Sequence, residues 1–127
     1  MNDSTHLVLS PLPKSWLLDL DGCIVRHNGH LEGNDELLIG VVEFWRSIPV
    51  ADRIIVMSSR PETERQAIMD FFAERGLRVD QIILGLPHGE RICVNDTKPS
   101  GLRTAVAINV ARDVGLGAVV FAIDESL

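Results

Sequence analysis

The sequence is poor in cysteine, in positive charge and in long apolar runs, and each shortage argues against a class of protein. Its two cysteines form no CxxC pair and are too few for a disulfide framework, which favours a reducing compartment. The formal charge of −6, with no cluster of lysine and arginine, argues against general nucleic-acid binding. No stretch approaches the roughly 20 apolar residues of a membrane span, and the N-terminus lacks the pattern of an export signal. We therefore expect a cytoplasmic protein without membrane contacts.

The 127 residues suit one domain with a single core, since 46% of them are apolar. Short β-rich runs alternate with helical patterns, which predicts an α/β fold: one doubly wound, Rossmann-like domain of three layers. The strands are nearly continuous in apolar residues, so we expect a five-stranded parallel sheet covered on both faces. The predicted strands are 15–20, 53–58, 81–86, 91–95 and 118–123, and the predicted helices are 34–49, 61–75 and 100–114. Residues 1–14 hold two prolines and little periodicity, which predicts an N-terminal extension before a core of residues 15–127.

Two aspartates, Asp19 and Asp21, end the first predicted strand in the stretch "LLDLDG". One residue between them puts both carboxylates on the same face, with Cα atoms roughly 6.5 to 7 Å apart, so their charges repel and need a partner. The carboxyl ends of parallel strands share one edge, where ligands bind, and Ser58, Asp96 and Lys98 follow other predicted strands. Such an edge predicts Mg²⁺ held by oxygen ligands, beside a phosphate held by Ser58 and Lys98.

The motifs "LLDLDGCI", "IIVMSSRPE" and "ICVNDTKPSG" occur in this order at predicted strand ends. In this the chain resembles the haloacid-dehalogenase-like phosphohydrolase superfamily, over roughly residues 15–123. The superfamily inserts a cap domain either just after the first strand or between the second and third strands. In this chain the first of these places holds only a flap-sized loop and the second holds a single helix, so the resemblance is to small members without a cap domain. It implies hydrolysis of a phosphate monoester, by analogy a sugar phosphate, with Mg²⁺ as cofactor.

The resemblance also implies a role for each matching residue. Asp19 would attack phosphorus and form an aspartyl-phosphate, and Asp21 would protonate the leaving oxygen and then activate water. The Mg²⁺ would be held by Asp19, by the backbone carbonyl of Asp21 and by Asp96. The phosphate-binding residues that the resemblance implies are Ser58, Ser59 and Lys98.

Three positions depart from the family pattern. Leu86 stands where compact relatives carry a lysine, so we assign the lysine role to Lys98. Asn95 precedes Asp96 where many relatives have a second aspartate, and Cys23 replaces a threonine. Beyond these motif positions, Arg60 is expected at the surface or the helix start, with Asp21 or substrate as a partner, and His88 is the best histidine candidate for substrate contact.

Other functions stay open at this stage. A catalytically silent phosphate-binding module on the same fold would explain Leu86, and a receiver-like phospho-acceptor domain would explain the acidic strand end. An open site without a cap domain needs another source of selectivity. That source is a macromolecular substrate, a neighbouring subunit of a homo-oligomer, or tolerance of many small phosphate esters.

Overall fold

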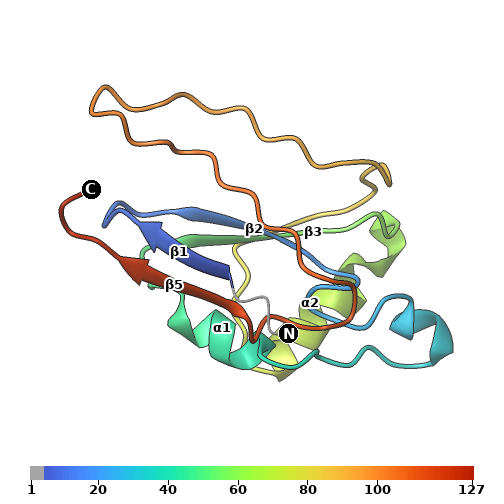
Figure 1. Ribbon diagram of the computed structural model, residues 1–127. Coiled ribbons are helices and arrows are strands. Elements are labelled where there is room, and N and C mark those ends of the chain that lie inside the picture. Colours follow the sequence, from blue (N-terminus) through green and yellow to red (C-terminus); the bar gives the residue numbers. More distant parts are fainter. Residues whose placement is uncertain (1–4) are drawn as a thin grey trace.

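The computed structural model describes residues 5–127, which form two small parallel sheets, two α-helices and two short 3₁₀ helices (Figure 1). The strands are β1 (Thr5–Leu9), β2 (Ser15–Asp19), β3 (Arg53–Met57), β4 (Gln81–Ile83) and β5 (Val119–Ile123). The helices are η1 (Gly29–Glu32), α1 (Val41–Ser47), η2 (Glu62–Glu64) and α2 (Arg65–Glu74). No helix within residues 5–127 has the length and apolar character that crossing a membrane requires.

The sheet that carries the first two motifs has three strands in the order β2-β3-β4, with Trp16 opposite Ile54 and Asp19 opposite Met57. Side chains alternate between its two faces. Trp16 and Ile54 point to the face that α1 and α2 cover, where Trp16 meets the ring of Phe44 edge-on at 5.6 Å. Leu17 points to the opposite face and is 52% exposed, because no helix covers that face within the described residues (Figure 1).

The second sheet joins the two ends of the chain. β1 lies within the predicted extension and pairs in parallel with β5, from Thr5 opposite Val119 to Leu9 opposite Ile123. Residues 1–4 of that extension lie outside the described residues. The predicted strand 118–123 therefore forms as β5, but it pairs with β1 and joins no larger sheet. The ring of Phe121 packs against Trp16 at 5.0 Å and so links the second sheet to the core.

The prediction of a five-stranded, three-layer Rossmann-like domain is wrong. The sheets have three and two strands, and the segment predicted to form strand 91–95 and helix 100–114 forms neither. Residues 86–112 instead leave the sheet and return to it as two extended halves joined by a turn, and this segment, here called the arm, runs along the uncovered side of the sheet (Figure 1). The other described residues, 5–85 and 113–127, are called the body.

The composition of the arm explains why it is extended. Its returning half carries Thr104, Val106, Ile108 and Val110 at alternate positions. Branching at Cβ restricts these side chains in a helix and favours extended backbone, where period-two spacing puts them on one face. A turn at the tip reverses the chain, with Gly101 at a φ of 96° and the Lys98 N–H donating to the Leu102 carbonyl at 2.8 Å. The prediction of a helix at 100–114 was wrong because it gave more weight to the spacing of the apolar residues than to the number of side chains branched at Cβ.

The arm rejoins the body where the chain passes close to the start of α1. A Cβ on Gly115 would lie 2.1 Å from the Ile39 carbonyl oxygen, and one on Gly40 would lie 2.3 Å from the Gly117 nitrogen. Both glycines also have a positive φ, at 91° and 81°. The Leu116 N–H donates to the Ile39 carbonyl at 2.9 Å. Glycine at both positions therefore lets these two segments touch.

Candidate functional site

The carboxyl ends of β2 and β3 lie side by side and continue in register beyond the strands. The Leu20 N–H donates to the Met57 carbonyl, and the Ser58 N–H donates to the Ile83 carbonyl, each at 2.9 Å. The structure thus brings Asp19, Asp21 and Ser58 to one edge of the sheet, as the strand-end motifs predict.

Asp21 forms a buried ion pair with Arg60, which follows β3. The Arg60 guanidinium donates from Nη2 to Asp21 Oδ1 at 2.6 Å and from Nε to Oδ2 at 3.1 Å, and its side chain is only 4% exposed. It also donates to both carboxylate oxygens of Asp35, at 2.9 and 2.8 Å. Burial alone would lower the pKa of Arg60, but the hydrogen bonds to Asp35 and Asp21 outweigh it and raise that pKa. One cation is therefore shared by two carboxylates.

Ser58 belongs to the same network. Its side chain is buried, its Oγ accepts a hydrogen bond from the Arg60 N–H at 3.0 Å, and the hydroxyl donates to Asp21 Oδ2 at 3.4 Å. Ser59, the next residue, is half-buried. Since the Ser58 hydroxyl is already engaged, Ser59 is the freer of the two predicted phosphate contacts.

Asp19 differs from Asp21 in being accessible, with 44% of its side chain exposed. Partial burial raises the pKa of its carboxyl, the nearby charge of Asp21 adds to the rise, and Arg91 opposes it. Arg91 lies at the base of the arm, with Nη2 3.9 Å from Asp19 Oδ1. Asp19 is thus an exposed carboxylate beside one basic side chain, which is an arrangement suited to contact with a ligand.

His30, on η1, reaches the ion-pair network from the other side. Its Nδ1 lies 3.9 Å from Asp21 Oδ1, and its Nε2 lies 3.8 Å from Glu64 Oε2. The buried Nδ1 has no hydrogen-bond partner among the described residues. An open groove of about 590 Å³ adjoins these residues, and its lining includes Asp35, Arg60 and Glu64.

Sequence reasoning missed Asp35, and it placed His30 in a loop near this edge but preferred His88 for substrate contact. Asp35 and His30 both lie in the loop between β2 and α1, which carries no periodic pattern that would place a side chain. Arg60 was expected near the surface, with Asp21 among its candidate partners; the structure buries it and pairs it with Asp21. The short spacing from Ser58 to Arg60 was the available signal, because it keeps Arg60 at the strand end.

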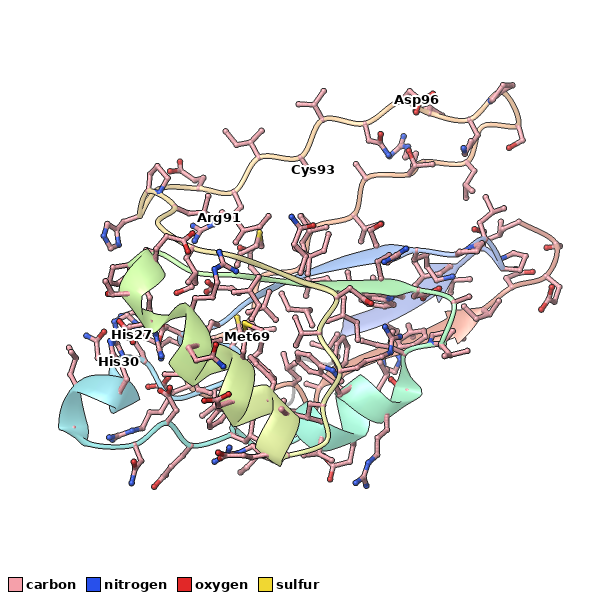
Figure 2. All side chains as sticks on the ribbon, turned by 180° about the vertical axis from the view of Figure 1, so that it is seen from behind. His27, His30, Met69, Arg91, Cys93 and Asp96 are labelled. Carbon is pink, nitrogen blue, oxygen red and sulfur yellow. The ribbon has the colours of Figure 1, made fainter. Side chains whose placement is uncertain are left out.

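The structure does not bring Asp96 and Lys98 to this edge. Both are exposed at the tip of the arm, where Thr104 Oγ donates to the Asp96 carbonyl. Figure 2 shows Asp96 at the opposite end of the arm from Arg91, far from His27 and His30. Leu86 lies at the arm's base, where its N–H donates to the Ser58 carbonyl at 3.2 Å, and His88 nearby is exposed.

The predicted Mg²⁺ ligands do not fit this arrangement. Asp96, at the tip of the arm, is far from Asp19 and from the backbone carbonyl of Asp21, which were the other two expected ligands. Among the described residues, the group of three with a metal-like spacing is Asp21, His30 and Asp35, whose ligand atoms lie within 4.8 Å of one another. Arg60 already supplies the positive charge at that place, so a divalent cation would have to displace it.

Comparisons with family models, with curated proteins and with solved structures find no match to this chain. The resemblance to haloacid-dehalogenase-like phosphohydrolases therefore depends on the quoted motifs alone.

Proposed function

We propose that the chain hydrolyses a phosphate monoester through covalent transfer of the phosphoryl group to Asp19. One observation carries the proposal: at the strand edge, Asp19 is accessible while its neighbour Asp21 is fixed by Arg60. Two carboxylates with different environments suit two different roles.

In the first step, an oxygen of Asp19 forms a bond to phosphorus while the ester P–O bond breaks, and the leaving oxygen departs with the electron pair. Arg91, 3.9 Å from Asp19, is the basic side chain placed to neutralise phosphoryl charge. This is the role that the sequence assigned to Lys98. Ser59, half-buried next to Ser58, would donate a hydrogen bond to the same oxygens.

In the second step, water attacks the phosphorus of the aspartyl-phosphate, inorganic phosphate leaves, and Asp19 is regenerated. Asp21, as the ion-pair partner of Arg60, is better suited to accept a proton from this water than to donate one in the first step. The enzyme should therefore favour esters with a good leaving group, such as aryl phosphates. No step is assigned to Mg²⁺, and the dependence on Mg²⁺ stays a prediction that the assay tests.

The test is hydrolysis of an aryl phosphate, with and without Mg²⁺, by the wild type and by Asp19→Asn. We expect Asp19→Asn to lose at least about a thousandfold in kcat. Mass spectrometry of acid-quenched wild type should find the phosphoryl group on the peptide that contains Asp19. Asp124→Asn, a change of the same kind beyond β5, is the matched control and should keep its rate. Turnover that survives Asp19→Asn would refute the proposal.

A phosphate-binding module without turnover is the second candidate, and the absence of Asp96 and Lys98 from the edge favours it. Calorimetric titration with inorganic phosphate separates the two. Phosphate binding that Arg91→Gln abolishes, with no turnover of any ester, would support the module and exclude the enzyme.

A further inference from the structure

The arm exposes apolar side chains that a chain in water would normally bury. Ile92 is 85% exposed, Val94 is 92% exposed and Val106 is 54% exposed. Figure 2 shows the outgoing half of the arm, with Arg91, Cys93 and Asp96, running clear of the sheet. Exposed apolar residues that follow one another along a segment mark a surface that binds another molecule.

Most backbone N–H groups of the arm also have no backbone partner among the described residues. Residues 88–96 and 105–112 donate no backbone–backbone hydrogen bond within the described part of the chain. Both ends are nevertheless fixed to the body: the Leu86 N–H donates to the Ser58 carbonyl, and the Asp113 N–H donates to the Gly22 carbonyl at 2.9 Å. Asp113 Oδ1 also accepts from the His27 N–H at 2.7 Å. The arm is therefore an extended segment that is anchored at both ends and whose backbone N–H groups are mostly unpaired, and such segments form β-pairs with another chain.

The body offers a surface of matching chemistry. The sheet face that no helix covers carries Leu17, 52% exposed, with half-buried Ile55 beside it on β3. On the arm itself, Ile108 and Val110 are partly buried against the core, whereas Ile92, Val94 and Val106 stay exposed, so the contact between the arm and its own body leaves these three side chains uncovered. Charge favours the same contact: residues 86–112 hold four basic and two acidic side chains, whereas the rest of the sequence holds eight and sixteen.

We propose that the arm binds a second copy of this chain, and that each arm lies on the uncovered sheet face of its partner. Every chain carries both an arm and an uncovered sheet face, so a twofold axis lets each arm bind the face of the other chain at the same time. If this twofold axis passes through the middle of the arm, the two arms run antiparallel, and the tip of each arm lies beside the base of the partner's arm. The tip carries Lys98 and Arg103, and the base lies at the acidic strand end with Asp19.

The first test measures the oligomeric state of the full chain by size-exclusion chromatography with light scattering. The wild type should have twice the 14.0 kDa mass of one chain and should dissociate on dilution. Val94→Asp, on the arm, should weaken the dimer by at least about tenfold while the circular dichroism stays unchanged. Val50→Asp, a matched control at a body residue that is 90% exposed, should leave the dimer intact. A wild type that is monomeric at every concentration would overturn the proposal, as would a dimer that Val94→Asp leaves unchanged.

The second test addresses the tip. The double variant Lys98→Glu, Arg103→Glu reverses two charges that would face the partner's acidic strand end, so it should weaken the dimer by at least about tenfold at low salt and by less at high salt. Arg46→Glu, on α1 of the body, changes an exposed basic residue on the helix-covered side and should have no such effect. Equal weakening by both variants would refute the placement of the tip. Neither measurement depends on phosphatase activity, so the dimer and the proposed function can fail separately.

Discussion

The body and the arm have similar apolar contents but differ in how far their side chains are buried. Eleven of the arm's 27 residues are apolar, close to the 46% of the whole chain, yet none of its side chains is fully buried. In the body, the same residue types form a core around Trp16, Ile54 and Phe72. The difference shows that apolar content does not bury a segment by itself. A segment must also meet a partner surface that satisfies its backbone.

The ion-pair network of Arg60 is the most sensitive point of the body. Arg60→Met leaves Asp21 and Asp35 mostly buried without their cation, which should cost about 3 to 5 kcal/mol in the free energy of unfolding. Urea denaturation measures the loss. Arg60→Lys keeps the charge but cannot bond both carboxylates in a forked geometry, and it should cost less. An equal loss for the two variants would show that the forked hydrogen-bond geometry of Arg60, and not its charge, stabilises the fold.

The next comparison removes the same side chain from the body and from the arm. Ile68, on α2, is 2% exposed, and Ile68→Ala should lose about 2 to 5 kcal/mol because it leaves a cavity in the core. Ile92, on the arm, is 85% exposed, and Ile92→Ala should change stability by no more than about 0.5 kcal/mol in dilute protein, where the monomer dominates. A large loss at Ile92 under those conditions would mean that the arm packs on its own body.

The sequence predicted the body better than the arm, for a physical reason. Strands near 15–20, 53–58 and 81–86 and the helix after Pro61 form close to their predicted places, since each combines local propensity with a buried face. The carboxyl ends of β2 and β3 then bring Asp19, Asp21 and Ser58 together, because parallel pairing fixes which residues share an edge.

What the sequence could not supply was the pairing of segments far apart. The stretch 91–95 has strand composition, and its backbone is extended, but composition does not say which strand it meets. The same applies to β5, which pairs with β1. At the site, His30 and Asp35 lie in a loop without periodicity, so only the folded chain shows that both approach Asp21.

The two cysteines give a chemical measure of the same contrast. Burial raises the pKa of the Cys23 thiol to about 11, and the charge of Asp19 adds to the effect. Relative to its ordinary value of 9.0, its thiolate fraction at neutral pH should fall about a hundredfold. Cys93 is exposed on the arm. Brief treatment with iodoacetamide followed by peptide mass spectrometry should find Cys93 modified well before Cys23. Equal rates would contradict the burial of Cys23, and protection of Cys93 only in concentrated protein would indicate that the arm is covered there.

The smallest expected effect lies where the arm touches the body, at Asp19. The pKa of Asp19 is raised in the folded state, so its ionised form is disfavoured there. The wild type therefore loses stability relative to Asp19→Asn as the pH rises through that raised pKa, and the two converge below the unfolded value near 3.9. At neutral pH, Asp19→Asn should melt slightly higher than the wild type.

Asp124 supplies a control of opposite sign. Hydrogen bonds from the Ser126 side chain and backbone lower its pKa, so Asp124→Asn should melt slightly lower at neutral pH, with the difference lost as the pH falls through the folded pKa. Arg91→Gln completes the comparison. The charge of Arg91 lowers the pKa of Asp19, so its removal should raise that pKa further in an NMR titration. An unchanged Asp19 titration in Arg91→Gln would show that the base of the arm does not reach the strand end in solution. The phosphate contact assigned to Arg91 would then have to be abandoned as well.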